Sequence, residues 1–211
     1  MSNEQLQGIH HVSAVTGQAA ENVRFYTQVL GMRLVAKTVN QDNLSSYHLF
    51  YGDETGAPGT DLTFFDVSEA RDLRPGTGLI SGTSLRVRGL NVLRAWAERL
   101  DQNGVRRTPI HKRAGRYALT LFDVEGQTLH LVDDSGELDR VPNTTPWQKG
   151  PVSPEKGIRG LGPVEITVGD MGPTRRALTD VFGFREVRSY EVEPLESERR
   201  AVESVATLSG S

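Results

Sequence analysis

Residues 9–39 read IHHVSAVTGQAAENVRFYTQVLGMRLVAKTV, and this stretch decides the fold. Residues 9–15 are β-prone, and a helix is predicted over 18–30 because apolar side chains recur there at helical spacing. Gly31 stands where a left-handed helix C-cap belongs, and a second β-prone run follows over 32–39. The stretch therefore predicts a strand–helix–strand unit.

The same order of elements occurs three times along the chain, which is a stronger signal than any single amphipathic helix. The second copy comprises a strand at 83–87, a helix at 91–103 and Gly104, and the third a strand at 164–168, a helix at 173–182 and Gly183. Asp170 suits the N-cap of the third helix. The repeat predicts three modules of one kind.

Three strand-like runs follow each of the first two helices. They are 32–39, 45–51 and 61–67 after the first helix, and 105–110, 116–122 and 128–132 after the second. The predicted class is α+β, with repeated βαβββ modules whose cupped mixed sheets carry helices on the outside. We place module 1 at 1–70, module 2 at 71–135, a proline-rich linker at 136–157 and a partial module 3 at 158–211.

The composition narrows the class of function. The net charge of -3 gives no basic face for nucleic acid, and no apolar run approaches the roughly 20 residues that span a bilayer. The 211 residues contain no cysteine, so a thiolate metal site or nucleophile is excluded. The N-terminus lacks the pattern of a signal peptide, and we expect a cytoplasmic protein.

The strongest candidate site is the pair His10–His11 on the first strand. Two cupped sheets that close on each other enclose a cavity, and alternate strand residues point into it. We therefore expect one of the two imidazoles to face the cavity as a metal ligand, since imidazole suits iron, manganese and zinc. The second imidazole would orient a substrate or transfer a proton. The alternative is a polar strand start with no ligand.

Other polar residues give weaker signals. We expect His48 to pack on a strand and His111 to lie at the surface. His130 stands on the last strand of module 2, where a cupped module can offer a ligand. Asp133 and Asp134 are expected to solvate the end of that strand.

Several motifs resemble one known family. The run GIHHVSAVTG at 8–17, NVRFY at 22–26 and YHLFYGD at 47–53 resemble ring-cleaving dioxygenases that act on hydroquinones and chlorinated hydroquinones. These enzymes belong to the vicinal-oxygen-chelate superfamily, which includes glyoxalases, bleomycin-resistance proteins and extradiol dioxygenases. The similarity extends over nearly the whole chain.

The resemblance implies an extradiol-type dioxygenase that inserts O₂ into a small aromatic diol and depends on Fe(II), with Mn(II) as the alternative metal. It implies His11 as the first metal ligand, and His10 and Ser13 as catalytic residues around it. The family has four modules, and its second ligand histidine and its glutamate lie in the fourth. We therefore expect activity only if a second chain supplies them, and open strand edges favour a homo-oligomer.

Two other functions stay open. The first is a metal-free small-molecule-binding protein of glyoxalase/bleomycin-resistance type, in which two cups close over an apolar ligand. The second is an inactive fragment whose concave face associates with other chains.

Overall fold

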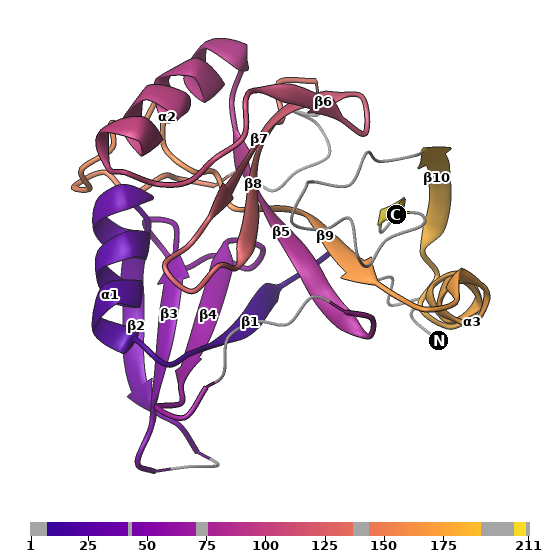
Figure 1. The fold of residues 1–211 in the computed structure, drawn as a ribbon, viewed down its shortest axis with the longest axis horizontal. Coiled ribbons are helices and arrows are strands. Elements are labelled where there is room, and N and C mark those ends of the chain that lie inside the picture. The colour runs from indigo at the N-terminus through magenta and orange to yellow at the C-terminus, as the bar shows by residue number, and fades with distance from the viewer. Residues whose placement is uncertain (1–7, 42–43, 71–75, 137–143, 191–204, 210–211) are drawn as a thin grey trace.

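The computed structural model describes residues 8–41, 44–70, 76–136, 144–190 and 205–209. In chain order the elements are β1 (His11–Thr16), α1 (Ala19–Arg24), the π-helix η1 (Phe25–Val29), β2 (Arg33–Val39), β3 (Tyr47–Gly52), β4 (Asp61–Asp66), β5 (Leu79–Val87), α2 (Leu90–Gln102), β6 (His111–Arg113), β7 (Arg116–Phe122), β8 (Thr128–Asp133), β9 (Leu161–Thr167), α3 (Met171–Arg176), the π-helix η2 (Ala177–Val181), β10 (Arg185–Tyr190) and β11 (Val205–Ser209). The predicted α+β class is confirmed, and Figure 1 shows α1 and α2 on one side of the molecule with α3 and β10 on the other.

The first sheet has the strand order β1-β4-β3-β2. Strands β1 and β4 are parallel, and the other pairs are antiparallel. One face of this sheet packs on α1 and η1, where Tyr26 stacks on Tyr51 with ring centroids 5.0 Å apart. Leu49, Leu62 and Phe64 complete this buried face. The other face is concave and carries the polar residues described below.

The second sheet has the order β6-β7-β8-β5-β9. Its last strand comes from the third repeat, because β9 pairs antiparallel with β5. The strand predicted over 105–110 is wrong: this segment contributes only an isolated bridge from Arg107 to Leu121, and the strand begins at His111. Pro109 offers a physical reason, since proline has no N–H for a ladder hydrogen bond.

The three predicted helix ends are confirmed. Gly31, Gly104 and Gly183 have φ angles of 66°, 67° and 70°, the left-handed conformation that glycine adopts without strain. Asp170 caps α3, since its side chain accepts a hydrogen bond from the Gly172 amide at 2.8 Å. The first and third helices end in π-helical turns, which the sequence pattern did not indicate.

Modules 1 and 2 are joined by the β7–β8 hairpin. The Tyr26 hydroxyl donates to Asp123 Oδ2 at 3.0 Å, and both groups are buried. Burial, with Asp123 close by, raises the pKa of Tyr26, and burial also raises the pKa of Asp123. In the same hairpin Glu125 accepts hydrogen bonds from the Gly17 amide at 2.7 Å and from the Thr16 hydroxyl.

The part of the predicted linker that the structure describes is packed against both modules. Val152 in this segment, and Ile158 directly after it, belong to the hydrophobic core. Asp53 in module 1 accepts from the Thr145 amide at 3.0 Å, and its pKa is lowered because backbone hydrogen bonds from Thr145, Ala57 and Thr55 outweigh its burial. The segment is therefore a structural strap between modules, and residues 137–143 of the prediction lie outside the described residues.

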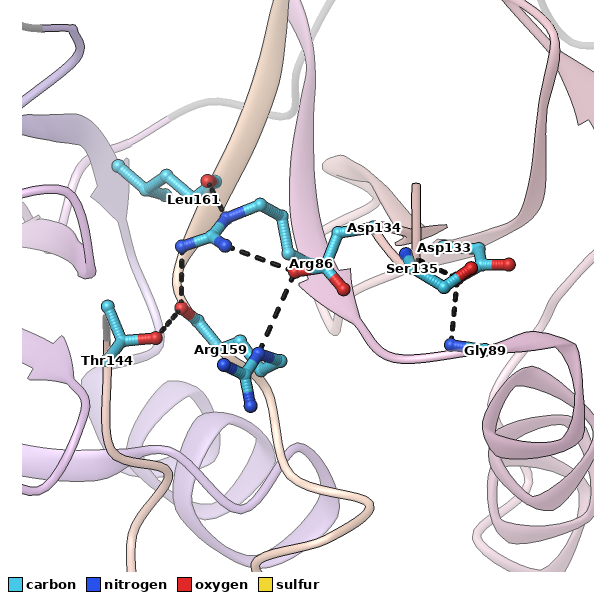
Figure 2. A network of polar contacts seen from close by, with 8 residues as sticks. All are labelled: Arg86, Gly89, Asp133, Asp134, Ser135, Thr144, Arg159 and Leu161. Carbon is cyan, nitrogen blue, oxygen red and sulfur yellow. Dashed lines mark hydrogen bonds and ion pairs between the residues drawn. The ribbon is translucent and has the colours of Figure 1, made fainter. Parts of the chain in front are cut away.

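Figure 2 shows how this strap is tied to module 2. The Arg86 guanidinium donates to Asp134 Oδ2 at 3.1 Å, and the two side chains are 3% and 1% exposed. The interpretation of Asp134 as a solvating residue is therefore wrong, because its carboxylate is the buried partner of an arginine. Asp133 does act at the strand end, where it accepts from the amides of Gly89 and Ser135.

The third repeat packs least tightly. No residue of α3 or η2 is buried, and Val181 is 76% exposed. Strand β10 pairs antiparallel with β11. Residues 191–204 of the predicted partial module lie outside the described residues. Among the helices in the described ranges, none has the length and apolar character needed to span a bilayer.

Candidate functional site

The concave face of the first sheet gathers the candidate residues. Side chains alternate between the two faces of a strand, so residues paired across strands share a face. His11 pairs with Asp61, Ser13 pairs with Thr63, and Phe50 also pairs with Thr63 from the other side. The members of this face on the three strands are His11, Ser13, Val15, His48, Phe50, Asp61, Thr63 and Phe65.

His10 and His11 lie together at the start of this face. Both are exposed, their rings meet edge to face with centroids 5.3 Å apart, and the two Nδ1 atoms are 3.1 Å apart. We predicted that alternation would turn them to opposite sides, but β1 begins at His11, so His10 is outside the regular strand. Since Nδ1 of His11 is engaged by its neighbour, its Nε2 is the ring nitrogen that would meet an external ligand.

Ser13 is the end of a short hydrogen-bonded chain. Its hydroxyl lies 2.9 Å from Thr63 Oγ1, which in turn lies 3.0 Å from His48 Nε2. The His48 ring is stacked on Phe65 with centroids 3.9 Å apart and lies 4.0 Å from Phe50. Burial, and then the charge of His11, lower the pKa of His48. The prediction that His48 packs on a strand is confirmed, but its link to Ser13 was missed.

Asp61 is a further residue that sequence reasoning missed. It stands opposite His11 in the parallel β1–β4 register, and its Oδ1 is buried with no hydrogen bond from the described residues. Burial raises the pKa of Asp61, while the charges of His10 and His11 oppose that rise. The signal that could have found it is its place at the start of β4, beside the first strand of the same module.

The residues in the described part of the chain do not complete a metal site. No group of three or more His, Asp or Glu side chains there is arranged to hold a metal ion. His11 and the orphaned carboxylate oxygen of Asp61 are a partial donor set at most, whereas Fe(II) in oxygenases takes two histidines and a carboxylate.

A cavity of about 360 Å³ opens beside His11 and Ser13. Its other walls come mainly from β9 and the third repeat and are largely apolar. The residues around it are Ile9, His11, Val12, Ser13, Ile80, Pro163, Val164, Ile166, Val168, Met171, Thr174, Arg175, Leu178, Phe184 and Glu186. At one end Arg175 forms an ion pair with Glu186. An apolar pocket of this size with few polar groups suits a small organic ligand.

The concave face of the second sheet is filled instead. His130, proposed as a candidate ligand, is fully buried, with Nδ1 2.9 Å from Thr120 Oγ1 and Nε2 3.5 Å from Glu165 Oε1. Arg113 makes two hydrogen bonds of 2.5 Å to the carboxylate of Glu165. Burial alone would raise the pKa of Glu165, but His130 and Arg113 outweigh it and hold that pKa at about 2. The Arg113 guanidinium, the Glu165 carboxylate and the His130 ring therefore form one buried cluster on this face.

The 3.5 Å contact of His130 is longer than a normal hydrogen bond, and its Nε2 finds no better partner in the described structure. The paired 2.5 Å contacts of Arg113 are the stronger interaction by geometry. His111, expected at the surface, is half-buried on β6, where its Nδ1 lies 3.1 Å from the Pro109 carbonyl.

The repeated βαβββ order and the open concave face define a class of protein. The family model of the glyoxalase/bleomycin resistance protein/dioxygenase superfamily matches residues 8–131, and the chain belongs to that superfamily. The resemblance drawn from the motifs is thereby confirmed.

Individual relatives narrow the comparison. The chain is 44% identical over 199 residues to MhqA of Bacillus subtilis, which is named provisionally as a ring-cleaving dioxygenase. The match covers 94% of this chain and 61% of MhqA. It is 32% identical to the chlorohydroquinone/hydroquinone 1,2-dioxygenase of Sphingobium indicum, covering 75% of this chain and 49% of the relative. The chain thus spans about half to three-fifths of the length of these relatives.

Solved structures agree with this assignment. A provisional dioxygenase of Bacillus subtilis superposes with a TM-score of 0.78 at 34% identity, covering 89% of this chain and 58% of the other. Glyoxalase I of Zea mays superposes with a TM-score of 0.63 at 17% identity, covering 88% and 58%, which shows the shared fold alone.

Proposed function

We propose that the chain is part of an extradiol-type ring-cleaving dioxygenase that binds a small aromatic diol against His11 and Ser13. The observation that carries the proposal is that both residues line the largely apolar 360 Å³ cavity, with the Arg175–Glu186 ion pair among its other polar groups. A single aromatic ring fits a space of that size, and two polar groups on one wall can orient its hydroxyls. The names of the relatives support the same chemistry.

Each candidate residue has a distinct part in this proposal. His11 offers Nε2 to a metal ion or to a ligand hydroxyl, and His10 holds the ring through the Nδ1 contact of 3.1 Å. Ser13 offers a hydroxyl backed by Thr63. Fe(II), with Mn(II) as the alternative, is the proposed metal, held by His11 with ligands that the described residues do not provide.

Metal analysis tests the proposal directly. Protein purified anaerobically without chelator and supplied with ferrous iron is expected to retain metal, and His11→Ala is expected to lose it. His111→Ala is the matched control, because it removes a half-buried imidazole on the other sheet. Oxygen uptake with hydroquinone should then require His11. Equal, negligible metal in all three proteins, with no oxygen uptake across several diols, would refute the dioxygenase proposal.

One observation favours a second function, a metal-free small-molecule-binding protein. The described residues hold no three-ligand cluster, yet the apolar cavity is present. In that case hydroquinone binds tightly in calorimetry while elemental analysis finds no metal. Binding that survives exhaustive chelation in the wild type and weakens in Ser13→Ala would establish this function instead.

We also propose that the chain forms a homo-oligomer. Strand β1 is an edge strand of its sheet, whereas the corresponding strand β5 is covered by β9. Exposed edges are templates for pairing with another chain. Sedimentation of a clean monomer at micromolar concentration would exclude this arrangement.

A further inference from the structure

Arg86 holds residues 159–161, the short segment in which the strap runs into β9, at several points. Its Nε donates to the Leu161 carbonyl at 2.7 Å, and its Nη2 donates to the Arg159 carbonyl at 2.8 Å. Its backbone adds two hydrogen bonds, since its amide donates to the Gly160 carbonyl at 2.9 Å and its carbonyl accepts from the Arg159 amide at 2.8 Å. Figure 2 shows this side chain reaching across from β5 to residues 159–161.

Asp134 fixes the guanidinium itself. The carboxylate of Asp134 is 1% exposed and lies 3.1 Å from Arg86 Nη1 and 3.7 Å from Arg159 Nε. A planar guanidinium with its acceptors placed around it has one favourable orientation, so the positions of those acceptors are fixed relative to one another. Residues 159–161 are thus held rigidly on module 2.

The same segment reaches module 1 close to the candidate site. The Leu161 amide donates to the Gly59 carbonyl at 2.8 Å, and the Gly59 amide donates to the His10 carbonyl at 2.7 Å. Gly160 makes the closest approach, because a Cβ built on it would lie 2.8 Å from the Gly59 carbonyl oxygen. Its φ of 113° is also a conformation that other residues rarely adopt. Only glycine allows the two segments to come this close.

The His10 backbone is sensitive to this crossing. His10 lies one residue before β1, so the strand ladder does not include it. Its carbonyl accepts a hydrogen bond from the Gly59 amide in the loop before β4, and its ring is the partner of Nδ1 of His11 at 3.1 Å. A displacement of about half an ångström would lengthen that contact beyond hydrogen-bond range.

We propose that Arg86, acting through Gly160, Leu161 and Gly59, is a positioning residue for the His10–His11 pair. Arg86 fixes the position of residues 159–161, and these residues fix the position of Gly59. Gly59 in turn holds the His10 backbone, and the His10 ring orients the ring of His11. The proposal concerns the orientation of the imidazoles and rests on the proposed function only for the use to which that orientation is put.

The test is NMR of protein labelled with ¹⁵N in the histidine rings. The five ring systems are assigned with single His→Gln variants. Gly160→Ala is expected to shift the ring signals of His10 and His11 and to leave those of His111 and His130 in place. The matched control is Gly89→Ala, because Gly89 has a φ of 97°, also outside the region that alanine adopts easily, but a Cβ built on it meets nothing within 4 Å. This control is expected to shift neither site signal.

A second variant keeps the test decisive if Gly160→Ala fails to fold. Arg86→Lys retains a positive charge beside Asp134 but loses the fork that holds the carbonyls of Arg159 and Leu161. It is expected to shift the same two ring signals. Unchanged His10 and His11 signals in whichever variant folds, or equal shifts in Gly89→Ala, would overturn the proposal. If the wild type binds neither a diol nor a metal ion, the proposed function is refuted, but the NMR result on the imidazoles still stands.

Discussion

The filled cup of module 2 makes the sharpest stability prediction. The substitution Glu165→Gln replaces a buried carboxylate with a neutral amide. In the wild type that carboxylate contacts two nitrogens of Arg113 and the ring of His130. The folded pKa of Glu165 is about 2 against its ordinary value of 4.5. That fall corresponds to about 3 kcal/mol of unfolding free energy when the carboxylate is ionised in both states.

The sign of the pH dependence follows from the direction of the pKa. Because the folded pKa is below the unfolded one, the stabilisation is present above pH 4.5 and is lost as the pH falls toward 2. By pH 3 only about 1 kcal/mol remains. The difference in stability between the wild type and Glu165→Gln should therefore shrink by about 2 kcal/mol between pH 7 and pH 3.

Urea unfolding followed by tryptophan fluorescence measures this difference, since the Trp96 side chain is 1% exposed in the folded core. Glu98→Gln, on the exposed side of α2, is the control and should change stability by less than about 0.5 kcal/mol at either pH. A wild-type minus Glu165→Gln difference that is the same at pH 7 and pH 3 would show that the buried cluster does not hold an ionised Glu165, and the reasoning would be wrong.

Three further predictions concern the joints of module 1 and the site. Tyr26→Phe removes the donor to buried Asp123 and should lower the unfolding free energy by about 1–3 kcal/mol in urea; no loss would contradict the bond. Gly31→Ala places a Cβ 2.6 Å from Val152 Cγ2. It should therefore lower the unfolding free energy by about 1–3 kcal/mol more than the control Gly104→Ala, whose Cβ lies in open space. Equal losses in the two variants would refute the clash. Thr63→Val keeps the shape of the side chain but removes the hydroxyl that links Ser13 to His48. Calorimetry should show about tenfold weaker hydroquinone binding in Thr63→Val and recovery in Thr63→Ser. Equal affinity in the wild type and Thr63→Val would show that the Thr63 hydroxyl does not support Ser13 in binding.

Local patterns located most elements of this fold, although the strand predicted over 105–110 is wrong and the π-helical turns were missed. Helical spacing, followed by glycine at positions that need a positive φ, located all three helix ends at Gly31, Gly104 and Gly183. One failure came from a contact distant in sequence. Asp134 looked like a solvating residue because its partner Arg86 is 48 positions away. Alternation did not predict the contact of His10 with His11, because the regular strand begins one residue too late for the rule to apply.

The candidate site was predictable only in its opening motif. His11 and Ser13 are two residues apart on one strand, so strand alternation places them on one face. Thr63 joins that face through the pairing of β1 with β4, and His48 joins it through β3. No local sequence pattern predicts that the first and last strands of a module pair in parallel. The residues behind Ser13 therefore could not be found without the sheet order.

The contrast between the two cups is the strongest argument for where a ligand binds. Both sheets have a concave face lined by alternate residues, but in module 2 the strand β9 supplies Glu165, and Arg113 neutralises it inside the cup. Opening that space would leave a buried charge unpaired, at a cost of about 3–5 kcal/mol. In module 1 the corresponding face carries exposed His11 and Ser13 beside a cavity. A small molecule meets no such penalty there, and this difference is the reason why we propose the ligand site in module 1 and not in module 2.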